Sequence, residues 1–229
     1  MERKYHGVKI IEGTGKGKIK ILDCSCPDFE IREIEDSDKE LGRFVRALKT
    51  FCENTRKLIR LIDKNIGHTE TGILNSHIKM VHDLALQSAL IEKISNGMCA
   101  EQATCEVCDM YIERFRSADQ DFVRDIAIDV FDVKLNVLNL LLGLKNYEVE
   151  HFDEDTVVIC RELPPSVVAR LDREHTKAIV VEVGSKHSHG AKLAEAMNIP
   201  SICGIIDIDK LVKDGETATV EDDYILISS

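Results

Sequence analysis

The sequence predicts an α/β domain into which an all-helical bundle is inserted. Short β-branched runs lie at both ends of the 229-residue chain, whereas the middle has helical periodicity only. Because the opening strands need a sheet to join, the simplest architecture returns the chain to that sheet after the bundle. We therefore predict a discontinuous α/β domain of residues 1–30 and 146–229, and a helical domain of residues 31–145.

The N-terminal segment GVKIIEGTGKGKIKILDCS alternates apolar and polar residues on both sides of a glycine-rich stretch, which predicts two short strands. The stretch GTGKG lacks the spacing of a phosphate-binding P-loop or of a dinucleotide fingerprint, and no helix follows it. We interpret it as a hairpin turn between the two strands.

Five helices are predicted for the middle of the chain. In the first, apolar residues such as Leu41, Phe44 and Leu48 recur at helical spacing, and Ser37 or Asp38 fits the cap position. Gly143 is a stop signal for the last helix. A set of this kind forms a bundle with its own core. The approximate ranges are 36–67, 69–84, 86–95, 100–115 and 121–142.

Strand character returns after residue 148. Four short runs are rich in β-branched residues: TVVIC (156–160), AIVVEV (178–183), SICGII (201–206) and YILIS (224–228). The segments PPSVVARLD and SHGAKLAEAMN, between these runs, are predicted helices. This alternation of strands and helices is typical of an α/β domain.

The bulk composition excludes several classes of protein. A net charge of −11 argues against a nucleic-acid backbone as the main partner and suits a basic protein partner or none. No apolar run reaches the ~18–20 residues that a membrane span needs. The N-terminus has no secretory signal pattern, so we expect a cytoplasmic protein.

The eight cysteines are scattered through the chain, and without a secretory signal we expect reduced thiols. Cys105 and Cys108 form a C-x-x-C pair, but they fall within an amphipathic helix and no second pair follows. A structural zinc site usually needs a second pair or spaced histidines. We interpret these cysteines as packing residues and predict no metal site.

Two histidines flank a serine where a predicted strand meets a predicted helix, in the segment GSKHSHGAKLAEAMNIP. Ser188 fits the N-cap position, which places His189 in the first turn of the helix. Backbone N–H groups and the positive end of the helix dipole favour a neutral, nucleophilic imidazole there, and an anion such as a phosphoryl group. Spacing alone leaves two other interpretations open. The histidines could be ordinary loop residues, or an H-x-H metal site completed by His6, His151 or His175.

The same segment resembles the phosphohistidine signature G-G-x-T-S-H-x-x-I-x-A-R-x-x-x-I-P of phosphoenolpyruvate-utilising swivelling domains. That signature is shared by enzyme I of the bacterial sugar phosphotransferase system, pyruvate phosphate dikinase and phosphoenolpyruvate synthase. The residues in register are Gly184, Ser188, His189, Ala194, Ile199, Pro200 and Gly204.

Three further segments resemble enzyme I in particular, so that the resemblance covers nearly the whole chain. GILNSHIKMVHD is similar to A-I-F-E-x-H-x-x-x-L-x-D, with His77 and Asp83 aligned. DVFDVKLNVLNLLLG and ELPPSVVARL are similar to enzyme I segments in the last bundle helix and before the active-site strand. The chain therefore resembles the N-terminal half of enzyme I, with an α/β swivelling phosphohistidine domain and an inserted helical bundle.

The resemblance implies a phosphoenolpyruvate-protein phosphotransferase. His189 would take, at Nε2, a phosphoryl group derived from phosphoenolpyruvate and pass it to a histidine of an HPr-like carrier protein. Phosphoenolpyruvate and Mg²⁺ would be bound by a C-terminal β/α barrel that these residues do not supply, so we expect no cofactor here. The residues implied to support the phosphohistidine are Gly184, Ser185, Lys186, His187 and Ser188. Those implied to bind the carrier are Leu74, His77, Ile78 and Asp83.

Several positions depart from the family pattern but leave the nucleophile intact. In the family, a threonine at the position of Pro164 bonds the active histidine. The other departures are Ser185, His187 and Glu195 in the histidine segment, and His68, Thr69, Asn75 and Asn136 in the bundle. These changes keep other functions open: a regulator that binds an HPr-like protein without transferring phosphate, a divergent free-standing phosphoacceptor, and a metal-binding H-x-H protein.

Overall fold

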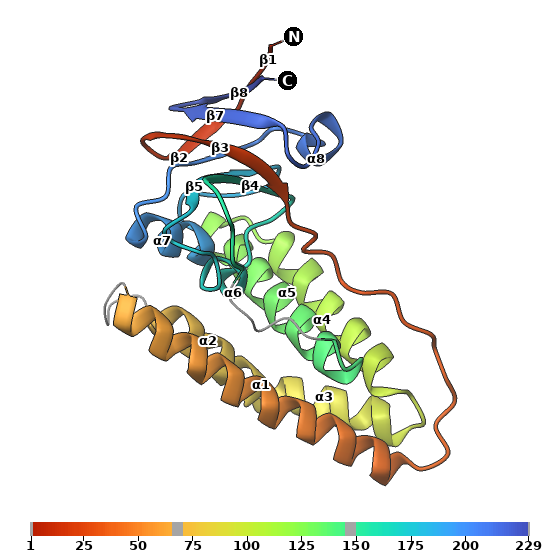
Figure 1. The fold of residues 1–229 in the computed structure, drawn as a ribbon. Coiled ribbons are helices and arrows are strands. Elements are labelled where there is room, and N and C mark those ends of the chain that lie inside the picture. The colour runs from red at the N-terminus through yellow and green to blue at the C-terminus, as the bar shows by residue number, and fades with distance from the viewer. Residues whose placement is uncertain (1, 66–70, 145–149, 229) are drawn as a thin grey trace. The chain divides into compact units, whose positions relative to one another are not determined.

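The computed structural model describes residues 2–65, 71–144 and 150–228. The chain divides into two compact units, Met1–Cys24 with Val149–Ser229, and Ser25–Glu148. The first unit contains strands and helices, and the described elements of the second are all helices (Figure 1). The chain passes between the units after residues 24 and 148, where the sequence predicts boundaries after residues 30 and 145.

A sheet forms the centre of the α/β unit, with the strand order β1-β8-β7-β3-β4-β5-β6-β2. Strands β3 to β6 run parallel to one another, and the outer pairs are antiparallel. The central strands β4 and β5 are buried along almost their whole length, which explains their continuous apolar sequence. The strands are β1 (Arg3–His6), β2 (Val8–Ile11), β3 (Thr14–Ile21), β4 (Thr156–Cys160), β5 (Thr176–Val181), β6 (Ser201–Cys203), β7 (Thr217–Glu221) and β8 (Tyr224–Ser228).

The predicted hairpin at GTGKG is wrong. Strand β2 pairs with β6, whereas β3 pairs with β4 and β7 and includes Gly15 and Gly17. A Cβ atom on Gly15 would lie 2.0 Å from the carbonyl oxygen of Lys177, and one on Gly17 would lie 2.3 Å from that of Asp155. These glycines therefore allow neighbouring backbone to approach the strand closely. Gly13, the first residue of this stretch, lies between β2 and β3 and has a φ of +142°.

Three helices of the α/β unit lie within the described residues: α6 (Pro165–Val168), α7 (His189–Ala196) and α8 (Ile208–Leu211). Helix α7 connects the parallel strands β5 and β6, and it packs against α6. Helix α6 is shorter than predicted, and the elements β1, β7 and α8 were not predicted. The core cluster of this unit includes Ile19, Val157, Ile159, Val180, Ile202 and Ile208.

The second unit confirms the predicted helical insert. Helix α5 ends before Gly143, whose φ of +70° is typical of a C-terminal stop. The cap of α1 differs from the prediction, because Asp36 rather than Ser37 or Asp38 accepts hydrogen bonds from the N–H groups of Asp38 and Lys39, both at 3.0 Å. The helices are α1 (Ser37–Asn65), α2 (Thr71–Val81), α3 (Leu84–Ser95), α4 (Ala100–Arg116) and α5 (Asp121–Leu141). Their core cluster includes Phe44, Phe51, Leu90, Ile94, Val107, Val133 and Val137.

An ionic network joins three of these helices. Arg43 in α1 donates to Glu40 at 2.6 Å and to Glu101 in α4 at 2.5 Å. Arg43 also donates to the carbonyl of Leu141 at 2.9 Å, and Glu40 accepts from the N–H of Ala100 at 2.8 Å. Burial acts to raise the pKa of Glu40, but these hydrogen bonds outweigh it and lower that pKa to about 2. The network thus ties α1 to the start of α4 and the end of α5.

Candidate functional site

The histidine segment lies in the loop that leads from β5 to α7. Ser188 is the N-cap of α7, as predicted, and its Oγ accepts a hydrogen bond from the N–H of Ala191 at 3.3 Å. The same Oγ donates to the carbonyl of Ser185 at 2.9 Å, and the Oγ of Ser185 accepts from the N–H of His187 at 3.0 Å. The two serines therefore define the shape of the loop and the point at which the helix begins.

His189 is the first residue of α7 and is half-buried, whereas His187 lies before the cap and is exposed. The first N–H groups of a helix lack intrahelical acceptors, and the helix dipole makes this end positive. The start of the helix therefore stabilises an anion bound at His189. An anion at His187 lies before the first turn and does not receive this stabilisation. The other residues implied to support the site lie in the same loop, with Gly184 half-buried and Lys186 exposed.

Gly190 positions the start of α7 against the segment before α6. A Cβ atom at this position would lie 2.1 Å from the carbonyl oxygen of Leu163, so the residue after His189 must be a glycine for the two backbones to meet. Gly190 is not among the site residues predicted from the sequence. The feature of the sequence that could have identified it is a glycine inside the first turn of a predicted helix. Glycine is unfavourable there unless a close contact requires it.

Pro164 follows Leu163 and is the N-cap of α6. The resemblance places at this position a threonine that bonds the active histidine. Proline has neither a hydroxyl group nor a backbone N–H, so Pro164 cannot donate such a bond. The close approach at Gly190 nevertheless keeps this segment beside the histidine loop.

The geometry does not support the metal interpretation of the H-x-H pair. Within the described ranges, the ligand atoms that lie within 4.8 Å of one another belong to Glu182, Asp207 and Asp209. His175 pairs instead with Asp172 at 2.9 Å, a hydrogen bond that raises the pKa of His175. Neither histidine of the pair belongs to the acidic group.

The helical unit has a groove of about 410 Å³ between α2, the start of α3, α4 and α5. We call it the bundle groove. Most of its lining is apolar, and Lys79 and Asp83 are its charged residues. Among the residues described, α1 contributes nothing to the lining. The lining residues are Ser76, Lys79, Met80, Asp83, Leu86, Cys108, Tyr111, Phe115, Ile126, Val130 and Val133.

The structure separates the four residues that the resemblance implies for partner binding. Asp83 is exposed in the bundle groove and caps α3 by accepting from the N–H of Leu86 at 2.9 Å, while Ile78 is half-buried. Leu74 and His77 are buried, at 0% and 1% exposure. A direct partner contact needs a surface position, which Leu74 and His77 lack, and their role in partner binding stays a prediction. His68 and Thr69 lie outside the described residues.

His77 instead belongs to a polar network inside the helical unit. Its Nε2 lies 3.4 Å from Oδ1 of Asp129, and its Nδ1 lies 3.7 Å from Oδ2 of Asp132. Asn136, which replaces the arginine of the family pattern, donates to Oδ1 of Asp132 at 2.7 Å. Burial acts to lower the pKa of His77, but the hydrogen bond with Asp129 and the charges of both carboxylates outweigh it and raise that pKa. The network links α2 to α5, two walls of the bundle groove.

No helix in the described ranges is both long enough and apolar enough to cross a membrane. The fold is an α/β unit that carries a histidine at the start of helix α7, with an inserted helical bundle. The chain belongs to the PEP-utilising enzymes. Residues 6–125 match the family model described as "PEP-utilising enzyme, N-terminal", and residues 152–223 match "PEP-utilising enzyme, mobile domain".

Curated relatives bear the name phosphoenolpyruvate-protein phosphotransferase. The chain is 26% identical over 229 residues to the protein of Mycoplasma capricolum, an alignment that covers 96% of this chain and 40% of the relative. It is 30% identical over 220 residues to that of Latilactobacillus sakei, with 95% of this chain and 38% of the relative covered. The chain thus spans about two-fifths of the length of these relatives.

Two solved structures have the same fold. A solution structure of Enzyme I superposes with a TM-score of 0.72 at 23% identity, and it covers 97% of this chain and 92% of its own. The N-terminal domain of "Enzyme 1 - Nitrogen" superposes with a TM-score of 0.61 at 18% identity and the same coverage. Both confirm the predicted fold class.

Proposed function

We propose that this chain is the phosphoryl-carrying part of a phosphoenolpyruvate-protein phosphotransferase. His189 receives a phosphoryl group derived from phosphoenolpyruvate and passes it to a histidine of an HPr-like carrier protein in the cytoplasm. The observation that carries the proposal is the position of His189 as the first residue of α7, directly after the Ser188 cap. The match to the mobile domain and the names of the relatives support it.

The chemistry follows from the helix start. The neutral imidazole of His189 attacks phosphorus through Nε2, so an N–P bond forms while the bond between phosphorus and the donor atom breaks. The donor atom is the enol oxygen of phosphoenolpyruvate, or a carrier imidazole nitrogen in the reverse direction. The phosphoryl oxygens lie against the N-terminus of α7, where N–H groups and the helix dipole stabilise their charge. The proposal assigns phosphoenolpyruvate and Mg²⁺ binding to the part of the relatives that this chain does not span.

The bundle groove is the proposed docking site of the carrier. Its apolar walls exclude water from an apolar side chain of the partner. The charges of Lys79 and Asp83 orient the partner protein. The net charge of −11 favours a basic partner. The residues that the resemblance implies for carrier binding lie on α2 or just after it, and α2 lines the groove together with α4 and α5, so the contact surface is proposed there.

Transfer from a phosphorylated HPr-like carrier, followed by peptide mapping, tests the proposal. We expect an acid-labile, base-stable phosphate on His189 that is absent from His189→Ala. The matched control is His187→Ala, which slows transfer but keeps the phosphorylated site, because His187 precedes the cap. Phosphate on His187, or full labelling of His189→Ala, would contradict the assignment.

Two further measurements separate this proposal from the regulator. Residues 1–229 alone, supplied with phosphoenolpyruvate and Mg²⁺, should remain unlabelled, whereas the phosphorylated carrier should label them reversibly. A carrier that binds in the bundle groove without labelling any histidine would identify a non-catalytic regulator. Efficient labelling directly from phosphoenolpyruvate would show that these residues hold a donor site that the proposal places elsewhere.

A further inference from the structure

The helix that begins at His189 carries a lysine one turn after this histidine. Lys192 is exposed, and its backbone N–H donates to the carbonyl of Ser188 at 3.1 Å, so it lies one turn beyond the cap. Residues three apart on a helix are neighbours on its surface, with Cβ atoms about 5–6 Å apart. Lys192 and the half-buried His189 therefore lie on the same face of α7.

The direction of helical side chains brings this lysine closer to the histidine. Each Cα–Cβ bond of a helix is tilted toward the N-terminus, so a long side chain covers the turn that precedes its own Cα atom. On α7 that turn contains His189. Lysine has a flexible stem and an ammonium group with three donors, so Lys192 can reach a phosphoryl group on Nε2 of His189.

A phosphoryl group at His189 needs hydrogen-bond donors that the surrounding backbone supplies only in part, because its three oxygens are strong acceptors. The Oγ of Ser188 accepts from the N–H of Ala191 at 3.3 Å, and the N–H of Lys192 is bonded within the helix. Pro164 has no donor at all. A side-chain cation at short range would supply the remaining donors.

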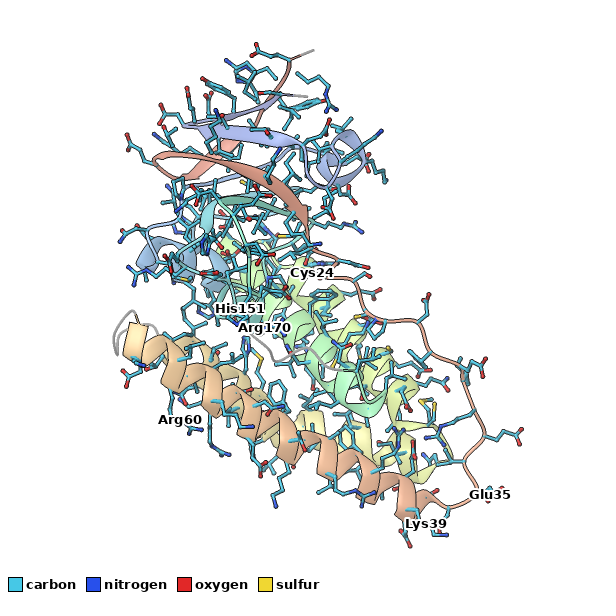
Figure 2. All side chains as sticks on the ribbon, in the orientation of Figure 1. Cys24, Glu35, Lys39, Arg60, His151 and Arg170 are labelled. Atoms are coloured by element: carbon cyan, nitrogen blue, oxygen red, sulfur yellow. The ribbon has the colours of Figure 1, made fainter. Side chains whose placement is uncertain are left out.

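The other cations of this segment are less well placed. Lys186 precedes the cap of α7, and Arg161 follows β4. Arg170 is only 7% exposed, and its Nε donates to the carbonyl of Ser166 at 3.0 Å. Figure 2 shows Arg170 near His151, where the chain returns to the α/β unit. None of these three cations shares a helix face with the first residue of α7.

The charge of Lys192 is available for a ligand. Within the part of the chain that the structure describes, its ammonium group has neither a hydrogen-bond nor an ion-pair partner, whereas that of Lys177 lies 3.2 Å from Asp155. The phosphohistidine signature has isoleucine at the position of Lys192 and arginine at that of Glu195. This chain therefore carries a cation one turn closer to His189 than the signature does.

We propose that Lys192 is a further residue of the phosphoryl-transfer site, and that its ammonium group donates hydrogen bonds to the phosphoryl oxygens on His189. The inference rests on the proposed function, because it takes the phosphohistidine as the ligand of the lysine. Hydrogen bonds from an ammonium group to phosphoryl oxygens are charge-assisted. They stabilise the phosphorylated form of the chain, so Lys192 shifts the transfer equilibrium from the carrier toward His189.

The transfer equilibrium with a phosphorylated HPr-like carrier tests the proposal. Lys192→Met keeps most of the apolar stem and removes the charge, so the equilibrium constant for transfer to His189 should fall roughly tenfold. Lys192→Arg should restore most of it. The matched control is Lys16→Met, which should keep the wild-type constant. Lys16 is exposed on β3, and its neighbour Gly15 approaches the backbone of Lys177, at the end of β5 opposite the histidine loop.

Salt dependence separates an effect of charge from an effect on the fold. Charges on exposed groups are screened over a Debye length of about 30 Å at 0.01 M salt and about 3 Å at 1 M. The difference between the wild type and Lys192→Met should therefore shrink as potassium chloride is raised from about 0.05 M to about 0.5 M. A difference that does not change with salt would place the effect in the fold of α7 and overturn the proposal.

Two other results would overturn the proposal. In one, Lys192→Met keeps the wild-type equilibrium constant. In the other, Lys186→Met or Arg161→Met loses labelling while Lys192→Met does not. Failure of the proposed function is distinguishable from both, because the carrier would then leave His189 unlabelled in the wild type as well. That result would remove the phosphohistidine on which this inference rests.

Discussion

Nε2 of His77 lies 3.4 Å from Oδ1 of Asp129 in the interior of the helical unit. Together with Asp132, this contact raises the pKa of His77 above its ordinary value of 6.5 in spite of burial. A group with a raised pKa in the folded state stabilises the fold fully below its unfolded pKa, and the stabilisation is lost as the pH rises through the folded pKa. We therefore predict that the free energy of unfolding of the wild type falls as the pH increases above about 6.5.

His77→Gln should remove this pH dependence and lower the stability by roughly 3 kcal/mol, because two buried carboxylates lose their cationic partner. Urea unfolding from about pH 5.5 to about pH 9, a range that brackets the ordinary pKa of histidine, measures both effects. The control is His82→Gln, since His82 is exposed on the same unit. If the free energy of unfolding of His77→Gln depends on pH as steeply as that of the wild type, another titrating group is responsible for the dependence.

The network around Arg43 predicts the opposite response to pH. The pKa of Glu40 is lowered from 4.5 to about 2, so its contribution is present above pH 4.5 and is lost as the pH falls toward 2. The shift corresponds to about 3 kcal/mol. Arg43→Met should lose part of this stabilisation at pH 7, because the N–H of Ala100 and the side chain of Arg32 still donate to Glu40. It should also show a flatter acid unfolding curve than the wild type.

The control for Arg43 is Arg46→Met, one turn further along α1, where the arginine is exposed. Its stability should stay within about 0.5 kcal/mol of the wild type, as for most surface substitutions. Circular dichroism during acid titration follows both variants. Equal losses in the two would show that helix α1 depends on its total charge and not on the contact between Arg43 and Glu40.

The sequence predicted the elements whose formation depends on residues close together in the chain. The helical spacing of Leu41, Phe44 and Leu48 identified α1, and the apolar runs of β4 and β5 identified buried strands. The prediction of a hairpin was wrong because strands pair with partners that are distant in the sequence. Gly15 and Gly17 are typical of a turn in sequence, yet each is required by a backbone more than 130 residues away, at Lys177 and Asp155.

In the candidate site, too, features set by neighbouring residues were predictable and contacts between distant segments were not. The Ser188 cap was predictable, because serine before a helical segment is a local signal. The close approach of Gly190 to Leu163 was not predictable, since it joins the first turn of α7 to the segment before α6. The role of His77 in partner binding came from the resemblance alone, and its partners Asp129 and Asp132 lie on another helix, which no local pattern around His77 indicates.

Gly190→Ala should destabilise the α/β unit and reduce labelling of His189. The added Cβ would lie 2.1 Å from the carbonyl oxygen of Leu163, so the backbone at the start of α7 must shift. Overpacking of this kind costs about 1–3 kcal/mol. Thermal unfolding and labelling by a phosphorylated carrier measure the two effects. Gly72→Ala is the control, because a Cβ there meets nothing within 4 Å. Full labelling of Gly190→Ala would show that this contact does not position His189.

Met80→Ala should weaken binding of an HPr-like carrier, because Met80 is half-buried in the bundle groove and would contribute apolar contact to the partner. We expect roughly a tenfold higher dissociation constant by calorimetry, which corresponds to about 1.4 kcal/mol. Met110→Ala is the matched control, since Met110 is 54% exposed on α4 and does not line the groove. Equal weakening in both variants, or none in Met80→Ala with its fold intact, would move the docking surface away from the groove. Chemical shifts of the other groove residues, followed in the same titration, would then locate the surface that the carrier uses.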